Sequence, residues 1–305
     1  MYLDKRAGAE SLSEGQIPRP SPAAGEVLVK VHATAVTPTE LQWFPTFNKQ
    51  SGEPRPFPIV LSHEYSGTIE ALGFGVNDIQ IGAAVYGLND WFANGAQAEL
   101  CVAPSTALAP KPKSLDFVHA AVVPISALTA WQGLFSRGNL QRGQRVLIHG
   151  GAGAVGIFAI QLARWRGAHV SATASSPNLD FVRSLGADQV IDYQTTKFEH
   201  VMCDVDVIFD TVGGETLERS WPLVKPGGKV ITIAAQNEGA TEQRIRDAFM
   251  LVEANSSQLT EIAKLIDAGV LRVFVAQTFS LNEAVEAYAR ARRGKMRGKI
   301  ALEVV

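Results

Sequence analysis

A glycine-rich segment, HGGAGAVG at 149–156, limits what this chain can fold into more than any other part of its sequence. The segment follows a buried-strand pattern, RVLIHG at 145–150, and opens an apolar helical pattern, AVGIFAIQLARWRG at 154–167, which ends at a glycine. A tight turn between a strand and a helix is the beginning of a βαβ unit. The segment therefore predicts a parallel α/β sheet in this part of the chain.

Gly151, Gly153 and Gly156 fit the spacing G-x-G-x-x-G. In that pattern the first glycine permits the turn, the second lets the backbone approach a pyrophosphate, and the third lets helix and strand pack closely. The helix begins at Ala154 and Val155, whose backbone N–H groups would face the phosphates at the positive end of the helix dipole. The segment predicts a dinucleotide site, and the alternative is a glycine-rich turn without a ligand.

Strand and helix patterns alternate from about residue 116 onward, as in a doubly wound parallel sheet. A helical pattern at 116–135 is interrupted at Pro124. The later elements share this alternation: strands are expected at 169–174, 189–193, 206–213 and 228–235, and helices at 177–186, 215–224 and 256–269. An extended stretch at 271–281, a helix at 282–294 and a strand at 297–304 close the chain.

Residues 1 to about 115 are rich in proline and glycine and contain short β-branched runs. Strands are expected at 26–36, 82–88 and 98–104, and 58–73 predicts two strands with a tight passage at Gly67. Short strands at this spacing, joined by glycine and proline turns, predict a partly closed antiparallel barrel.

Composition excludes several classes of function. Hydrophobic residues make up 46% and charged residues 19% of the 305 residues, which fits a globular protein with a sizeable core. The net charge is −2, so nucleic acid is not an expected partner. The apolar runs are too short for a membrane span, and no signal peptide is expected. Two isolated cysteines, Cys101 and Cys203, indicate a reducing compartment, and we expect a cytoplasmic protein.

The end of the second strand of the βαβ unit, SATASSP, predicts which nicotinamide cofactor binds. NAD enzymes place an acid there, about 20 residues beyond the glycine turn, to hold the ribose hydroxyls. This chain has Ala174, Ser175 and Ser176 instead. Two hydroxyls can hydrogen-bond a 2′-phosphate without the repulsion that a carboxylate would add. The segment favours NADP(H), and the alternative role for the serines is N-capping before Pro177.

The chain begins with a barrel pattern, continues with the glycine-rich unit and returns to the barrel pattern. This order resembles the medium-chain dehydrogenase/reductase superfamily over nearly the whole chain. The resemblance is strongest to its zinc-independent quinone oxidoreductases, the zeta-crystallin-like branch. The matching phrases are GEVLVKVHATAVTPTEL (25–41), PISALTAWQGL (124–134), RVLIHGGAGAVG (145–156), LGADQVIDY (185–193), DTVGGETLERS (210–220) and RGKIALEV (297–304). The segment MYLDKRAGAESL lacks the apolar opening strand that this family usually shows.

The resemblance implies an α/β fold: a GroES-like catalytic domain, a partly closed β-barrel at 1–115 and 265–305, with a doubly wound Rossmann domain for NADP(H) inserted at 116–264. It also implies a homodimer and a cofactor in the cleft between the domains. It places Tyr193 near the adenosine phosphate, Lys299 near the cofactor and Thr129 by the nicotinamide. Ile233 and Ala234 would line the nicotinamide with backbone.

His63 and Glu64, in VLSHEYSG at 60–67, match the His-Glu pair of the zinc-dependent relatives. The resemblance places Thr37 and Ile125 where those relatives have their other zinc ligands, and neither can replace a thiolate. Since catalytic zinc needs three protein ligands, no metal is expected. His63 is then either a half-buried histidine satisfied by Glu64 or by backbone, or a polar group of the active site.

Without zinc an alcohol is not strongly polarised, whereas a quinone or α,β-unsaturated carbonyl compound can accept hydride directly. We therefore expect an NADPH-dependent reductase of such a small-molecule acceptor. Its candidate catalytic residues are Thr37, His63, Tyr65 and Thr129, and aromatic residues that could line the acceptor pocket are Trp43, Phe44, Phe47, Trp91 and Phe92. A zinc-free alcohol or carbonyl dehydrogenase and a low-turnover NADPH-binding structural or sensor protein are the alternatives.

Overall fold

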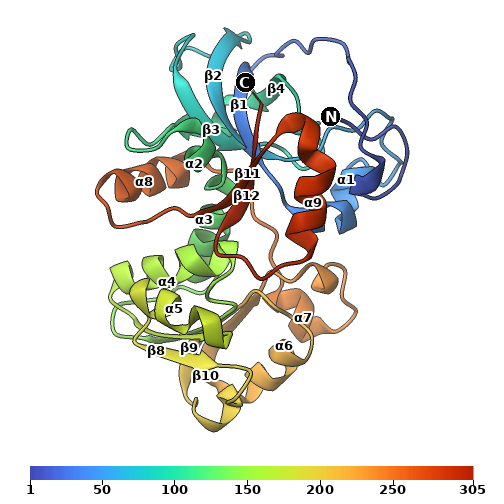
Figure 1. Ribbon diagram of the computed structural model, residues 1–305. Helices are drawn as coiled ribbons and strands as arrows, with labels where there is room; N and C mark the ends of the chain where they lie inside the picture. Colours follow the sequence, from blue (N-terminus) through green and yellow to red (C-terminus); the bar gives the residue numbers. More distant parts are fainter. Residues whose placement is uncertain (305) are drawn as a thin grey trace. The chain divides into compact units, whose positions relative to one another are not determined.

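The structure is a computed structural model that describes residues 1–304, and these residues form two compact units (Figure 1). Unit 1 contains Met1–Ile125, Glu253–Gly269 and the described residues from Val273 onward, and unit 2 contains Ser126–Val252 and Val270–Arg272. The expected α/β class is confirmed, with one largely antiparallel and one parallel sheet. The functional domain division expected at 115/116 and 264/265 stays a prediction.

Unit 1 is built on a seven-stranded sheet in the order β11-β12-β1-β2-β3-β5, with β4 paired to β1. Its strands are β1 (Glu26–Ala35), β2 (Glu64–Leu72), β3 (Ala84–Leu88), β4 (Leu100–Pro104), β5 (Leu108–Pro110), β11 (Val275–Ser280) and β12 (Lys299–Glu303). The first half of β1 pairs with β4 and its last three residues pair with β12, both antiparallel. β1 therefore joins the strands from the two ends of the chain.

Gly67 lies inside β2, where a tight passage between two strands was expected. β2 runs without a break and pairs with β1, with Gly67 opposite Val31. A Cβ atom on Gly67 would lie 2.1 Å from the backbone oxygen of Lys30. The expectation of two strands is wrong, because this glycine serves a close approach of two backbones and not a turn.

Apolar residues of β1 pack into the core of unit 1, as the strand pattern predicts. Val27, Val29 and Val31 belong to a buried cluster with Tyr65 of β2 and Cys101 of β4. A second cluster joins the N-terminal segment to α9; its members include Leu3, Leu61, Phe279, Tyr288 and Leu302. These two clusters stabilise the sheet by packing together side chains from strands that are distant in the sequence.

Short helices surround the sheet of unit 1. They are η1 (Ala9–Ser11), η2 (Pro38–Gln42), α1 (Phe44–Phe47), η3 (Ser105–Ala107), α2 (Phe117–Ala121), α8 (Ser256–Asp267), η9 (Leu281–Glu283) and α9 (Ala284–Arg292). Asn255 caps α8 by accepting from the Gln258 N–H. The Tyr86 hydroxyl of β3 donates to the Leu259 carbonyl at 2.6 Å, which fixes α8 to the barrel.

Unit 2 contains a five-stranded parallel sheet in the order β10-β9-β6-β7-β8. Its strands are β6 (Arg145–His149), β7 (His169–Ala174), β8 (Gln189–Asp192), β9 (Val205–Asp210) and β10 (Val224–Thr232). Every residue of β9 is buried, as expected of a central parallel strand. The strand order reverses at β6, whose carboxyl end is the expected place for a ligand.

Helices connect these strands, as the alternating pattern predicts. α3 (Pro124–Trp131) begins at the proline that interrupts the helical pattern, and a π-helical turn, η4 (Gln132–Arg137), follows it. The others are α4 (Ala154–Arg166), η5 (Ser176–Asn178), α5 (Leu179–Ser184), η6 (Phe198–His200), α6 (Glu215–Ser220), η7 (Trp221–Leu223), η8 (Ala235–Asn237) and α7 (Gln243–Ala248). α4 ends at Gly167, which has a φ of 81°.

Across residues 1–304, no helix has both the length and the apolar character needed to cross a membrane.

Candidate active site

Backbone hydrogen bonds hold the glycine turn between β6 and α4, one to β7 and one within the turn. The Gly151 N–H donates to the Thr173 carbonyl at 2.9 Å, and the Gly153 N–H donates to the Gly150 carbonyl at 3.0 Å. A Cβ atom on Gly156 would lie 2.2 Å from the Gly150 oxygen, whereas one on Gly153 would lie 3.3 Å from it. The third glycine therefore serves close packing of the turn against the helix, as its place in the pattern predicts.

The N-terminus of α4 fits a phosphate group. Its N-cap residue is Gly153, so no side chain caps the helix, and the first turn carries no acidic residue. The backbone N–H groups of Ala154, Val155 and Gly156 precede the first intrahelical donor, Ile157, which donates to the Gly153 carbonyl. Free N–H groups and the positive end of a 13-residue helix favour a bound anion.

A buried histidine supports this turn from inside the sheet. His149 contacts the Thr173 hydroxyl through Nδ1 at 3.2 Å and the Ser220 hydroxyl through Nε2 at 2.9 Å. The same Thr173 oxygen accepts from the Gly150 N–H at 3.2 Å. Burial lowers the pKa of His149 to about 4, so its ring is neutral near pH 7. The sequence motif contains this residue, but its supporting role was not anticipated.

Asp210, at the end of β9, organises the neighbouring strand end. Its fully buried carboxylate accepts from the Gly213 N–H at 3.0 Å and from the Thr232 hydroxyl at 2.8 Å. The Ile233 N–H donates to the Asp210 carbonyl at 3.1 Å, and the Ala234 N–H donates to the Thr232 hydroxyl at 3.4 Å. The backbone at Ile233 and Ala234 is thus fixed at the carboxyl edge of the sheet, and its contact with a nicotinamide stays a prediction.

The predicted adenosine-binding residues lie at the ends of β7 and β8. Ser175 and Ser176 follow β7, and Tyr193 follows β8 with 59% of its side chain exposed. The Ser176 hydroxyl donates to the carboxylate of Asp192 at 2.5 Å. Sequence reasoning missed Asp192, because it considered only the end of the second strand and not the parallel strand beside it.

His63 is enclosed within unit 1. Only 1% of its side chain is exposed, its Nε2 donates to the Ala93 carbonyl at 3.2 Å, and its ring centroid lies 5.0 Å from that of Trp91. Its Nδ1 faces the Glu40 carboxylate at 3.7 Å. Glu40, fully buried, also accepts from the Ser62 N–H at 2.7 Å. The carboxylate beside His63 is therefore Glu40 and not Glu64. Of the two partners expected for a structural His63, Glu64 or backbone, the structure shows the backbone, at Ala93.

Glu64 instead forms a buried ion pair with Lys299 of β12. Its other carboxylate oxygen accepts from the Ile125 N–H at 2.9 Å, which joins β2 to the start of α3. Burial raises the pKa of Glu64 above its ordinary value, and the charge of Lys299 opposes that shift. Lys299 is 8% exposed, and its predicted contact with the cofactor stays a prediction.

The other candidate catalytic residues differ in burial and place. Thr37 is 8% exposed, and its hydroxyl has no hydrogen-bond partner within residues 1–304. Tyr65 is fully buried in the barrel core, and burial raises the pKa of its hydroxyl well above the usual value. Thr129 lies on α3, in unit 2, with 4% of its surface exposed. Thr37 and His63 thus share unit 1, and each catalytic role stays a prediction.

No group of three or more His, Cys, Asp or Glu side chains in the described part of the chain is arranged to hold a metal ion. Both cysteines are free; Cys101 is buried and Cys203 is exposed. The absence of a bound metal from the active protein stays a prediction.

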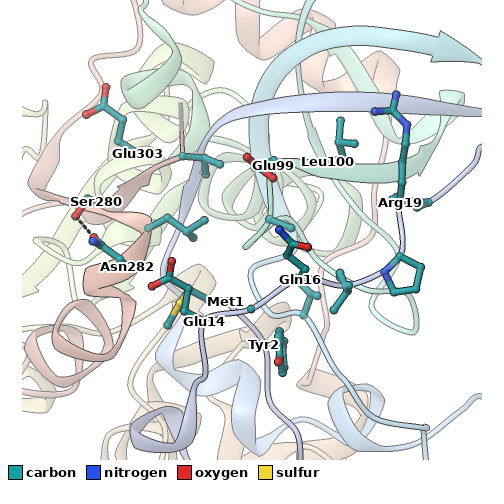
Figure 2. Close-up of a pocket in the computed structure, with 18 residues that line it drawn as sticks. Met1, Tyr2, Glu14, Gln16, Arg19, Glu99, Leu100, Ser280, Asn282 and Glu303 are labelled. Atoms are coloured by element: carbon teal, nitrogen blue, oxygen red, sulfur yellow. Dashed lines mark hydrogen bonds between the residues drawn. The ribbon is translucent and has the colours of Figure 1, made fainter.

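Unit 1 also contains a cavity of about 710 Å³ that belongs to none of these groups. Figure 2 shows its lining, which combines the N-terminal segment at Tyr2 and Gln16 with Glu99 beside β4 and Asn282 beside β11. The predicted site residues are not among the residues that line it.

Two family models match the chain. The alcohol dehydrogenase GroES-like domain matches residues 23–113, and the zinc-binding dehydrogenase model matches residues 185–302. The first match confirms the GroES-like part of the expected fold.

Curated relatives of this chain are oxidoreductases by name. A human mitochondrial NAD(P)H oxidoreductase, RTN4IP1, is 33% identical over 92% of this chain and 82% of its own. The chloroplastic quinone oxidoreductase QR1 of Triphysaria versicolor is 30% identical, over 97% and 95%. A 2-methylene-furan-3-one reductase of Solanum lycopersicum is 29% identical, over 96% and 75%. Two of these names give organelles, so the cytoplasmic location of this chain stays a prediction.

Solved structures share the fold over the full chain. The quinone oxidoreductase of Coxiella burnetii superposes with a TM-score of 0.90 at 30% identity, covering 100% of this chain and 98% of its own. A mycobacterial protein complexed with NADPH superposes with a TM-score of 0.82 at 27% identity, covering 100% of both chains.

Proposed function

The chain belongs to the medium-chain dehydrogenase/reductase superfamily of oxidoreductases, and from this premise we propose that it reduces a quinone or an α,β-unsaturated carbonyl compound with NADPH, without zinc. The observation that carries the proposal is the uncapped N-terminus of α4 above the glycine turn at Gly151–Gly156. Its free N–H groups, at the carboxyl edge of a parallel sheet, suit a pyrophosphate. The named activities of the relatives supply the class of acceptor.

The cofactor is NADP(H), as in the NADPH-bound structural neighbour. The backbone N–H groups of Ala154, Val155 and Gly156 would hold the pyrophosphate, which Gly151 and Gly153 allow to approach the turn. Ser175, Ser176 and Tyr193 would hold the adenosine end. Thr129, Ile233, Ala234 and Lys299 are the proposed residues on the nicotinamide side. When bound, NADPH supplies a hydride from nicotinamide C4.

The donor set around His63 suits a reductase that needs no zinc. The family resemblance assigns Thr37 and Ile125 to the positions of the missing zinc ligands. The His63 ring contacts the Ala93 carbonyl and Trp91. An electrophilic acceptor needs alignment and stabilisation of its developing oxyanion more than it needs a Lewis acid. Two of the four candidate catalytic residues, Thr37 and Tyr65, have hydroxyls with no hydrogen-bond partner within residues 1–304, and Thr37 is the more exposed of the two. We place it first as the hydrogen-bond donor to the acceptor.

A homodimer is part of the proposal. β10 ends the parallel sheet of unit 2, and β11 ends the sheet of unit 1. An edge strand presents unpaired N–H and C=O groups that a second copy can complete.

Turnover with a panel of acceptors tests the proposed function. The oxidation of NADPH is followed by its absorbance with 9,10-phenanthrenequinone, 1,4-naphthoquinone, an alkenal and a saturated aldehyde as acceptors. We expect turnover with the quinones or the alkenal and little with the saturated aldehyde. Preference for the saturated aldehyde, or for alcohol oxidation, would favour a dehydrogenase. NADPH binding without turnover would favour a sensor.

A further inference from the structure

A carboxylate lies at the corner where the sequence predicts a phosphate. Asp192 is the last residue of β8, opposite Ala174 in the register with β7. Its Oδ2 accepts from the Ser176 hydroxyl at 2.5 Å, and its Oδ1 accepts from the Gln194 N–H at 3.0 Å. The Gln194 side-chain oxygen accepts from the Ser176 N–H at 3.2 Å. Both polar groups of Ser176 are therefore directed toward the end of β8.

The corner formed by the ends of β7 and β8, at Ser176 and Asp192, is where the adenosine ribose is expected to bind. In parallel sheets that bind dinucleotides, the residue that recognises the ribose follows the second strand, about 20 residues beyond the glycine turn. In this sheet the second strand is β7, because β6 precedes the glycine turn and β7 follows α4. Ser175 and Ser176 come directly after β7, and the carboxyl ends of β7 and β8 share one edge.

The hydrogen-bond chemistry of Ser176 conflicts with simple recognition of a 2′-phosphate. A hydroxyl has one hydrogen to donate. The Ser176 hydroxyl lies 2.5 Å from the Asp192 carboxylate and 3.1 Å from the Gln194 side-chain oxygen, and the nearer, charged acceptor is Asp192. Phosphate oxygens accept only, so binding a phosphate requires this hydrogen to leave Asp192. The carboxylate would then face a group with a charge of about −1.5 to −2. A ribose 2′-hydroxyl, by contrast, can donate to Asp192.

None of the ion pairs formed within residues 1–304 includes Asp192. Three arginines of unit 2 are paired with other acids: Arg183 with Asp180 at 2.6 Å, Arg164 with Asp188 at 2.9 Å and Arg219 with Glu199 at 2.5 Å. The side chains whose contacts meet at this corner are the Asp192 carboxylate, the Ser176 hydroxyl and the Gln194 amide.

We infer that Asp192 is a specificity-determining residue, which engages the Ser176 hydroxyl and opposes the 2′-phosphate, so that this chain discriminates only weakly between NADPH and NADH. The inference rests on the proposed function, because it concerns the cofactor of that same site. Ser176 favours the phosphate and Asp192 opposes it, and the balance of the two sets the preference. NADP(H) stays the proposed cofactor, and we expect its affinity to exceed that of NAD(H) only slightly.

Dissociation constants for NADPH and NADH, measured by nucleotide fluorescence with the whole chain, test the inference. In Asp192→Asn we expect NADPH to bind about three- to tenfold more tightly, because one like charge at close range is removed. NADH should bind equally or more weakly, because the acceptor for its 2′-hydroxyl is weakened. In Ser176→Ala we expect NADPH to bind more weakly, with NADH nearly unchanged.

Asp180→Asn is the matched control, because it removes the same charge from an exposed residue of α5 that contacts Arg183 instead. An NADPH-to-NADH ratio that changes equally in Asp192→Asn and Asp180→Asn would overturn the inference while leaving the proposed function intact. A wild-type chain that prefers NADPH by more than about a hundredfold, 2.7 kcal/mol by the tenfold rule, would also overturn it. If neither nucleotide binds, the proposed function and the inference fall together.

Discussion

The carboxylate of Glu40 lies 3.7 Å from the imidazole of His63, and both side chains are buried. A carbonyl oxygen only accepts, so the Ala93 contact places a hydrogen on Nε2 of His63 and leaves Nδ1 facing Glu40. Glu40 also accepts from the Ser62 N–H and from the Tyr288 hydroxyl at 3.2 Å. Glu40, in η2, thus joins the segment that precedes β2 to α9, and we expect this group to stabilise unit 1.

Substitution of Glu40 tests that role. In Glu40→Ala, the Ser62 N–H and the Tyr288 hydroxyl lose a buried acceptor, and we expect the free energy of unfolding to fall by about 3–5 kcal/mol. Glu40→Gln keeps an acceptor oxygen, and we expect the free energy of unfolding to fall by only about 1–2 kcal/mol. Urea unfolding followed by circular dichroism gives both values. Equal effects of the two variants would contradict the assigned contacts.

His63→Ala separates a structural from a catalytic histidine. Because the ring is enclosed, we expect a loss of stability of about 2–4 kcal/mol from the cavity. We expect kcat and KM for the quinone to change by less than about threefold, or about 0.7 kcal/mol. A fall in kcat of a hundredfold in a variant that remains folded would restore His63 as a catalytic residue.

Because Glu64 is buried, it makes the free energy of unfolding depend on pH in a direction that its pKa shift predicts. Its pKa is raised from 4.5 in the folded state, so the folded protein binds this proton more tightly than the unfolded chain. The resulting stability is present below pH 4.5 and is lost as pH rises through the folded pKa. Glu64→Gln should remove this loss from the curve of unfolding free energy against pH. Glu261→Gln, on the exposed face of α8, is the control and should leave the curve unchanged.

His149 makes the free energy of unfolding depend on pH in the opposite direction. Its pKa is lowered from 6.5 to about 4 by burial, so the unfolded chain binds the proton first as pH falls. Stability should fall by about 3 kcal/mol between pH 7 and pH 4 from this group alone. In His149→Gln we expect a lower stability at pH 7 but a shallower fall toward pH 4. A variant with an unchanged slope would show that His149 does not cause it.

Two glycine substitutions separate packing from ligand approach. In Gly156→Ala the new Cβ meets the Gly150 carbonyl, and we expect a destabilisation of about 1–3 kcal/mol. In Gly153→Ala the nearest protein atom is 3.3 Å away, so stability should hold while NADPH binds at least about tenfold more weakly, or 1.4 kcal/mol. Thermal unfolding and nucleotide titration measure the two effects. Unchanged NADPH affinity in folded Gly153→Ala would contradict the proposed phosphate site.

Local patterns were sufficient to predict most elements of the fold. The strand at 145–149, the glycine turn and the helix ending at Gly167 follow from hydrophobic period and glycine chemistry alone. The same rules failed at Gly67, because a glycine needed for a turn and a glycine needed for backbone approach look alike in a sequence. Only the pairing of β1 with β2 distinguishes them.

The site was less predictable than the fold because its key contacts join distant residues. Glu40 and His63 are 23 positions apart, and Glu64 and Lys299 are joined by the pairing of β12 with β1 and of β1 with β2. Asp192 reaches Ser176 from a parallel neighbour strand, and no spacing rule for the second strand includes it. Parallel register, read from the order of strands, was the signal that could have found it.

Transfer of deuterium to an enone, from NADPH labelled at both hydrogens of nicotinamide C4, shows whether the cofactor delivers its hydride to the acceptor. The protein is first treated with a chelator, and its metal content is measured before the reaction. We predict one deuterium at the β-carbon of the saturated product, seen by mass spectrometry and NMR, at an undiminished rate. Loss of activity on chelation with recovery on added zinc, or a product without deuterium at that carbon, would contradict the account.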